Sequence, residues 1–78
     1  MATVELYTTP TCSQCAKTRA WFKAQGIDFV DNNIVSDPQA LQRMIEISGS
    51  RNVPVIQIGE RVIVGFNESE ILASLDEK

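Results

Sequence analysis

The chain has 78 residues, 44% of them hydrophobic and 22% charged, which is typical of one small globular domain spanning 1–78. Seven Lys and Arg against ten Asp and Glu give a formal charge of −3, and the basic residues are scattered. This pattern argues against nucleic-acid binding, which needs clustered cations. No apolar run approaches the roughly 18 residues of a membrane span, and the first residues do not form a signal peptide, so we expect a cytoplasmic protein with no membrane partner.

The N-terminal third of the chain predicts a strand followed by a helix. Apolar and polar residues alternate over 3–8, which indicates a short strand. A helix then begins at Cys12 or Ser13 and extends to Gln25. Gly26 follows as the residue that adopts the left-handed conformation at a helix C-terminus.

The middle of the chain predicts a second strand and a second helix. The strand is expected over 27–34, interrupted by the polar residues 31–33. Asp37 is the expected N-cap of the helix, Pro38 occupies its first turn and Gly49 ends it. The inner face of this helix is expected to carry Leu41, Met44, Ile45 and Ser48.

The C-terminal part of the chain predicts a hairpin and a third helix. The strands of the hairpin are 53–58 and 61–64, joined by a tight turn at Gly59-Glu60. Asn67 caps the last helix, and Glu70 three residues later completes a capping-box pattern. The order β-α-β-α-β-β-α predicts a four-stranded mixed sheet flanked by helices, a three-layer α/β domain.

Cys12 and Cys15 are the only cysteines, three positions apart at the predicted start of the first helix. In a helix that spacing separates their Cα atoms by roughly 5 Å, which a disulfide accepts. Closing so short a loop constrains the unfolded chain by at most about 2 kcal/mol, so the pair indicates redox chemistry rather than a structural staple. The helix N-terminus favours a thiolate on Cys12, and the nearest cation in the sequence is Lys17. We therefore expect Cys12 to attack a substrate disulfide and Cys15 to resolve the mixed disulfide.

Metal binding is the main alternative use of the two thiols. Zinc in proteins takes four ligands, whereas the chain offers two Cys and no His. We therefore expect a monomer with no metal and no tightly bound cofactor. Two competing hypotheses stay open: a dimer that holds zinc or an iron–sulfur cluster through Cys12 of each chain, and a pair of buried cysteines without chemistry.

Pro54 stands directly before the apolar segment 55–58 and has two interpretations. A proline is tolerated as the first residue of a strand, because it need not donate a hydrogen bond to the sheet. Alternatively, a cis-proline turn lies beside the Cys12 helix and leaves the backbone of Val53 free to pair with an extended thiol substrate. From the residues alone the trans form is favoured, because only about 5–6% of such bonds in folded proteins are cis.

Three segments resemble the signature regions of glutaredoxin-like redoxins: 7–15 (YTTPTCSQC), 50–56 (SRNVPVI) and 63–68 (IVGFNE). The resemblance covers nearly the whole chain in the same order. It implies the thioredoxin-like fold of the glutaredoxin type, a cis peptide bond before Pro54, and thiol–disulfide exchange by a nucleophilic Cys12. The residues it implies for substrate or thiol binding are Thr11, Ser13, Gln14, Arg51, Asn52, Val53, Pro54, Gly65, Phe66 and Asn67.

Two branches of this family differ in their electron donor. Glutathione-using glutaredoxins usually have Pro-Tyr between the cysteines and Thr before Val-Pro, where this chain has Ser13-Gln14 and Asn52. NrdH-type redoxins, which take electrons from NADPH through thioredoxin reductase, typically share Gln14 and Gly65-Phe66, although their preceding Trp-Ser is Ile63-Val64 here. The resemblance implies either donor, with disulfide-containing proteins as substrates and ribonucleotide reductase among the candidate partners.

Several of these residues also have a purely structural explanation. Arg51 occupies a position that helps to bind a peptide carboxylate in the glutathione users. A cation in a solvated loop explains Arg51 equally well. Gly65 suits a tight turn, and we favour a packing role for Phe66 against Ile71. Trp21 is expected at the edge of the core rather than against a partner. The sequence thus predicts a dithiol–disulfide oxidoreductase, with a glutathione-dependent glutaredoxin, a cluster-carrying dimer and a thioredoxin-fold binding module as alternatives.

Overall fold

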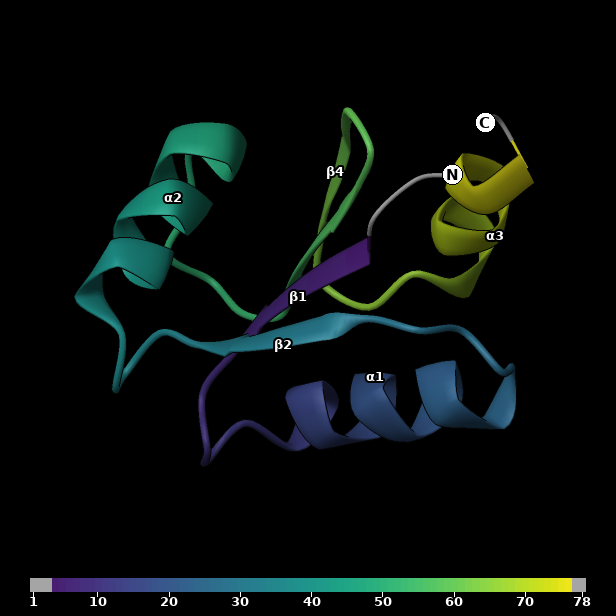
Figure 1. Ribbon diagram of the computed structural model, residues 1–78, viewed down its shortest axis with the longest axis horizontal. Coiled ribbons are helices and arrows are strands. Elements are labelled where there is room, and N and C mark those ends of the chain that lie inside the picture. The colour runs from purple at the N-terminus through teal and green to yellow at the C-terminus, as the bar shows by residue number, and fades with distance from the viewer. Residues whose placement is uncertain (1–3, 77–78) are drawn as a thin grey trace.

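The computed structural model describes residues 4–76, whose elements follow the predicted order β-α-β-α-β-β-α. The elements are β1 (Val4–Thr8), α1 (Ser13–Ala24), β2 (Val30–Asn33), α2 (Pro38–Ser48), β3 (Val55–Ile58), β4 (Arg61–Val64) and α3 (Glu68–Asp76), drawn in Figure 1. Thr3, which the predicted first strand included, lies outside the described residues.

The strands form a four-stranded mixed sheet in the order β2-β1-β3-β4, as predicted. β1 runs parallel to β2 and antiparallel to β3, and β3 pairs antiparallel with β4. The register pairs Tyr7 with Val55 and Val55 with Val64. The end of β1, the start of β3 and the end of β4 therefore meet at one edge of the sheet, from which the loop to Cys12 departs.

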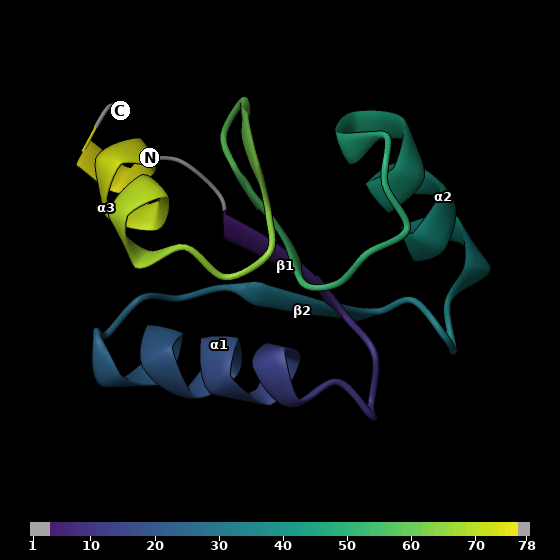
Figure 2. The same ribbon diagram turned by 180° about the vertical axis from the view of Figure 1, so that it is seen from behind.

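The core lies in two layers, one on each face of the sheet. Successive strand residues point to opposite faces, so Leu6 packs in one layer and Tyr7 in the other. The face of Leu6 is covered by α1 and α3 through Phe22 and Ile71, whereas α2 covers the opposite face through Met44. Figures 1 and 2 show the β3–β4 hairpin between α2 and α3, with α1 alongside β2. The predicted three-layer architecture is confirmed.

The edge strand β2 is shorter at both ends than the predicted range 27–34. Its polar residues do not interrupt the strand, because their side chains find partners on β1 and α1. The Asn32 amide, for example, donates to Glu5 Oε1 at 3.3 Å. Ile27 precedes the strand and packs against the layer that contains Leu6, so its apolar side chain serves the core without belonging to the sheet.

The predicted ends of α2 are confirmed. Asp37 Oδ1 accepts hydrogen bonds from the backbone N–H groups of Gln39 at 3.1 Å and Ala40 at 3.3 Å, which satisfies donors that have no partner within the helix. Pro38 occupies the first turn, and Gly49 ends the helix with φ +68°, a left-handed conformation that favours glycine.

The predicted inner face of α2 is correct for two residues and wrong for two. The layer from α2 consists of Ala40 and Met44, both buried, with Leu41 and Ile47 packed against them. Ile45 and Ser48 are half-buried and lie outside this layer, and the Ser48 hydroxyl instead donates to the carbonyl of Met44. The face was misplaced because Ala40, Met44 and Ile47 follow the helical repeat, and alanine is a weak signal of burial in a sequence.

Candidate redox site

The loop after β1 delivers Cys12 to the first turn of α1, as predicted. Cys12 is the N-cap, with an extended backbone at φ −87° and ψ 116°, and α1 proper begins at Ser13. Its N–H donates to Thr9 O at 3.4 Å and its carbonyl accepts from Ala16 N at 3.3 Å. The side chain of Cys12 therefore lies at the positive end of the helix dipole, where free N–H groups favour an anion.

The Cys12 sulfur acts as the cap of the helix. Its Sγ accepts a hydrogen bond from the backbone N–H of Cys15 at 3.2 Å, the role that a Ser or Asp oxygen usually plays. Both cysteines are free thiols, but they differ in access: Cys12 is half-buried, whereas Cys15 is completely buried. A reagent or substrate from solvent therefore meets Cys12 first.

The environment separates the pKa values of the two thiols. Burial raises the pKa of Cys12, but the opposing hydrogen bonds from the Cys15 thiol and from the N–H groups of Cys15 and Gln14, together with the charge of Arg19, lower it overall. For Cys15, burial is the largest effect, and its hydrogen bond to Cys12 and the negative charge there add to it, raising the pKa to about 11. Cys12 is thus the more readily ionised of the two thiols.

Pro54 lies at the same edge of the sheet, directly before β3. The Val53–Pro54 peptide bond is cis, as the family resemblance implied and contrary to the trans form favoured from the residues alone. Pro54 is buried, Val53 is half-buried, and β3 begins at Val55 rather than at residue 53. The predicted strand was too long because Pro54 carries no N–H to donate to the sheet.

The turn between β4 and α3 completes this edge. The N–H of Gly65, whose φ is +86°, donates to Pro54 O at 2.7 Å, so the turn is bonded to the proline segment. Phe66 is half-buried and packs edge-on against Trp21 of α1, with ring centroids 5.8 Å apart at 71°. Trp21 also contacts Phe22 at 5.6 Å, so it lies at the edge of the core as expected. Phe66 packs against the core layer that contains Ile71, consistent with its structural explanation.

The remaining predicted contact residues lie on the surface. Thr11, Ser13, Gln14, Arg51, Asn52 and Asn67 are all exposed. Asn67 also has a structural task, because its Oδ1 accepts from Glu70 N at 3.2 Å and so caps α3 as predicted. The structure thus brings the start of α1, the segment before β3 and the turn before α3 to one edge of the sheet.

The sequence analysis missed a polar network beside the cysteines. Arg19 of α1 forms an ion pair with Asp31 of β2, and its Nη2 donates to Thr8 Oγ1 of β1 at 2.8 Å. The Thr8 hydroxyl in turn donates to Asp31 Oδ1 at 2.8 Å. The cation that acts on the thiols is therefore Arg19, although Lys17 is nearer in the sequence. The sequence did contain a signal for this cation: Arg19 is four residues after Cys15 on a predicted helix, so the two side chains share one face.

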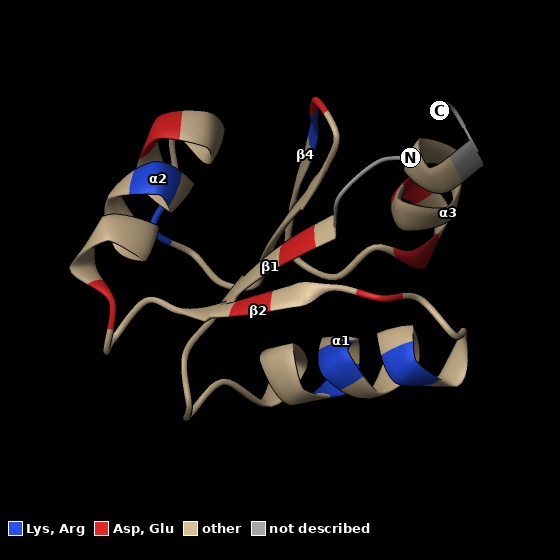
Figure 3. Cartoon of the chain, viewed as in Figure 1, with Lys and Arg blue, Asp and Glu red and all other residues tan. Residues whose placement is uncertain are grey.

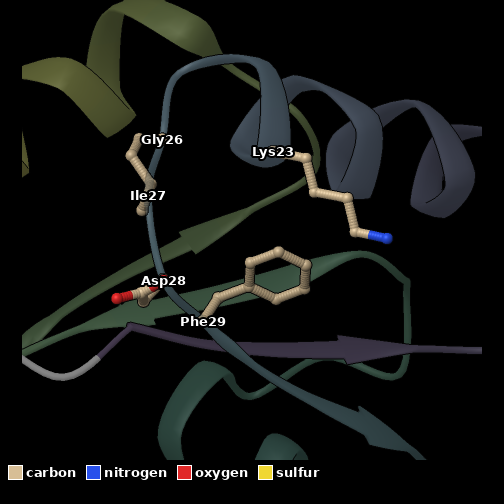
Figure 4. A pocket seen from close by; sticks show the side chains of 5 residues that line it. All are labelled: Lys23, Gly26, Ile27, Asp28 and Phe29. Carbon is tan, nitrogen blue, oxygen red and sulfur yellow. The ribbon is translucent and has the colours of Figure 1, made fainter.

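A hollow of about 400 Å³ lies at the other end of α1, lined by Lys23, Gly26, Ile27, Asp28 and Phe29 (Figure 4). It is separated from Cys12 by the length of the helix and does not serve the thiols. Within residues 4–76, no group of three or more His, Cys, Asp or Glu side chains is placed to hold a metal ion. No helix in this range is long and apolar enough to cross a membrane.

Comparisons with known proteins identify glutaredoxins and glutaredoxin-like proteins. The glutaredoxin family model matches residues 4–63. A protein described as glutaredoxin-like from the rubredoxin operon of Clostridium pasteurianum is 44% identical over 68 residues, which cover 87% of this chain and 91% of that protein.

Solved structures support the same family. A glutaredoxin from Archaeoglobus fulgidus has a TM-score of 0.85 and 30% identity, covering 96% of this chain and 87% of that one. The NrdH-redoxin of Escherichia coli, a glutaredoxin-like protein described as having a thioredoxin-like activity profile, has a TM-score of 0.80 and 28% identity, covering 90% and 91%. These neighbours confirm the predicted thioredoxin-like fold.

Proposed function

The chain belongs to the glutaredoxin family, and from this premise we propose that it is a dithiol–disulfide oxidoreductase that reduces disulfides in other proteins through Cys12 and Cys15. The observation that carries the proposal is the asymmetry of the two thiols. The Cys12 thiol is accessible at a helix N-terminus with a lowered pKa, whereas the Cys15 thiol is buried with a pKa raised to about 11. An accessible thiol that ionises readily, next to a buried thiol that keeps its proton, is the arrangement that suits attack followed by resolution.

In the first step, the Cys12 thiolate attacks one sulfur of the substrate disulfide. A new S–S bond forms between Cys12 and the substrate, the substrate S–S bond breaks, and the leaving thiolate takes a proton from solvent. The charge of Cys12 disappears in this step. With it disappear the hydrogen-bond acceptor and the negative charge that raise the pKa of Cys15, so formation of the mixed disulfide itself makes Cys15 easier to deprotonate.

In the second step, Cys15 loses its proton and attacks the sulfur of Cys12. The Cys12–Cys15 disulfide forms, the mixed disulfide breaks, and the second substrate sulfur leaves as a thiolate that is then protonated. The substrate has gained two electrons and two protons. Both electrons come from the protein, whereas the protein releases only the proton of Cys15, and the other proton comes from solvent because Cys12 reacts as a thiolate. An external donor must return the two electrons before another turnover.

The residues around Cys12 are proposed to hold the substrate. An extended substrate segment pairs with the backbone of Val53, while Thr11, Ser13, Gln14, Arg51, Asn52, Pro54, Gly65, Phe66 and Asn67 border it. The structure supports this role by bringing three chain segments to one edge of the sheet. A protein that works by reducing disulfides needs a reducing compartment, so we propose that it acts in the cytoplasm.

For the donor, we propose NADPH through thioredoxin reductase. The support is Gln14 between the cysteines and the Gly65-Phe66 turn, together with the similarity to the NrdH-redoxin with a thioredoxin-like activity profile. Glutathione is the second candidate, favoured by the match to the glutaredoxin family model and to a glutaredoxin of known structure. Ribonucleotide reductase remains one candidate among the disulfide-containing substrates.

The donor is tested by reducing the oxidised protein with NADPH plus either thioredoxin reductase or glutathione and glutathione reductase. We expect rapid NADPH consumption with thioredoxin reductase and slow consumption with glutathione, and none above background with Cys12→Ser in either system. Rapid consumption only with glutathione would reassign the donor. Stoichiometric iron in the purified protein, with no disulfide reduction from either donor, would contradict the oxidoreductase and favour the cluster-carrying dimer.

A further inference from the structure

We propose that Arg19 is a positioning residue of the dithiol, held by Thr8 and Asp31 so that its guanidinium stays beside Cys12 and Cys15. The inference rests on the proposed function, since it gives the network a task in thiol exchange. It concerns three residues that lie outside the two-cysteine motif and that belong to three different elements: β1, β2 and α1.

Helical spacing places Arg19 on the side of α1 that carries the cysteines. Cys15 and Arg19 are four residues apart and Cys12 and Arg19 are seven apart, so the three side chains share one face of the helix. Lys17 follows Cys15 by two residues, about 200° further around the helix, and it is exposed. Of the two cations near the motif, only Arg19 faces the thiols.

The sheet register explains why Thr8 and Asp31 are available to Arg19. Thr8 lies two residues after Leu6 on β1, and Asp31 pairs with Leu6 in the parallel ladder, so both side chains point to the face covered by α1. Figure 3 shows α1 with basic residues and no acidic ones, next to the acidic position on β2. Asp31 is the carboxylate within reach of the Arg19 guanidinium.

The contacts form a closed ring that fixes the guanidinium in one orientation. Arg19 Nε pairs with Asp31 Oδ2, Arg19 Nη2 donates to Thr8 Oγ1 at 2.8 Å, and Thr8 Oγ1 donates to Asp31 Oδ1 at 2.8 Å. Thr8 is completely buried, and the Arg19 and Asp31 side chains are about one-third exposed, at 30% and 35%. A long side chain on a surface helix is otherwise mobile, so the ring is what keeps this charge near the cysteines.

The charge of Arg19 acts on both thiols in the same direction. It lowers the pKa of Cys12 and opposes the rise in the pKa of Cys15. Asp31, the other charged member of the ring, has the opposite sign, so we expect its charge to oppose that of Arg19 at the thiols, while the Thr8 hydroxyl is neutral. The ring therefore holds the positive charge of Arg19 near the dithiol. The negative charge of Asp31 is expected to limit the effect of that charge on the pKa values of the thiols.

The test measures the thiolate of Cys12 directly, by ultraviolet absorbance and by the rate of iodoacetamide alkylation across pH, in the reduced full-length protein. Arg19→Gln is expected to raise the pKa of Cys12 and to slow alkylation at neutral pH about two- to fourfold. Lys17→Gln is the matched control, because it removes the same charge from the same helix outside the ring, and its effect is expected to be smaller. Arg19→Lys keeps the charge without the planar fork and should restore part of the rate.

The Asp31→Asn variant distinguishes an electrostatic effect of the ring on the Cys12 thiol from a contribution of the ring to the stability of the fold. The Asn oxygen still accepts from Arg19 Nε, but the negative charge is gone, so alkylation at neutral pH should become faster, opposite to Arg19→Gln. Shifts of Arg19→Gln and Asp31→Asn in the same direction, or equal effects of Arg19→Gln and Lys17→Gln, would overturn the proposal. If Arg19→Gln does not fold, Asp31→Asn and Arg19→Lys still decide. These measurements need no substrate or donor, so a protein that reduces no disulfide yet shows the opposite shifts would refute the proposed function alone.

Discussion

The sharpest consequence of the site is that alkylation discriminates strongly between two cysteines three residues apart. The perturbation is a limiting dose of iodoacetamide added to the reduced protein at pH 7. Cys12 has a pKa lowered from its ordinary value, so a larger fraction of it is thiolate at this pH than of an ordinary cysteine, for which a pKa of about 8.5 gives about 3%. Cys15, with a pKa raised to about 11, is thiolate in about one molecule in ten thousand.

The expected ratio of rates follows from these fractions. The thiolate of an ordinary cysteine with a pKa of about 8.5 is about 300-fold more populated than that of Cys15, but a thiolate of lower pKa is also a weaker nucleophile, which reduces this advantage by about 10- to 20-fold. An ordinary cysteine should therefore react about 20-fold faster than Cys15, and we expect a preference for Cys12 of this order, which the complete burial of Cys15 increases. As pH rises, the rate at Cys12 should level off at a lower pH than that of an ordinary thiol, because its pKa is lowered, whereas the rate at Cys15 should continue to rise toward its pKa of about 11.

Mass spectrometry resolves the two sites. Trypsin leaves both cysteines in one peptide that ends at Lys17, and fragment ions locate the label within it. The control is the same reaction in denaturant, where both thiols have ordinary pKa values and the preference should disappear. Equal rates at Cys12 and Cys15 in the native protein, from neutral to alkaline pH, would refute the argument from the helix N-terminus and burial.

Three substitutions test other parts of the structure. Cys15→Ser removes the resolving thiol, so mixed disulfides with partner proteins should accumulate on non-reducing gels and be absent from the Cys12→Ser/Cys15→Ser variant; failure to trap any partner would question the role of Cys15. Asn67→Ala should lower the free energy of unfolding by about 1 kcal/mol in urea, compared with a negligible change for Ser69→Ala, without slowing alkylation of Cys12. A loss of reductase activity at unchanged stability would instead place Asn67 in contact with substrate. Ser74 is 3% exposed and its Oγ has no hydrogen-bond partner among the described residues, so Ser74→Ala should raise the free energy of unfolding by about 1 kcal/mol; a loss would mean that the hydroxyl is satisfied.

The features that the sequence predicted correctly depend on neighbouring residues. The residues around Cys12 determine that it caps a helix beginning at Ser13. The caps formed by Asp37 and Asn67 are equally local, because each cap bonds to N–H groups two or three residues away. The different positions of Cys12 and Cys15 follow from the same short-range geometry, since one thiol lies at the helix end and the other one turn inside. Such features need no knowledge of how strands pair.

The features that the sequence analysis missed depend on residues far apart in the chain. Thr8 and Asp31 are separated by 23 positions and meet only because β1 and β2 pair in parallel with Leu6 opposite Asp31. The same pairing explains why the polar residues 31–33 form part of β2 instead of interrupting it. The cis bond before Pro54 is a different case, because residue statistics favoured trans and only the resemblance of whole segments implied cis.

This division between local and distant contacts bears on what sets the reactivity of Cys12. The N–H of Cys15, 3.2 Å from the sulfur, belongs to the backbone, so every helix that begins in this way supplies it regardless of side chains. Ser13 and Gln14 between the cysteines are uncharged and exposed, so their side chains add no charge to the site. The charge of Arg19, by contrast, belongs to a side chain, so a substitution at position 19 should change the reactivity of Cys12 without moving the start of the helix. Two chains with the same Cys-Ser-Gln-Cys segment are therefore expected to differ in thiolate reactivity when they differ at position 19 or at its partner on β2.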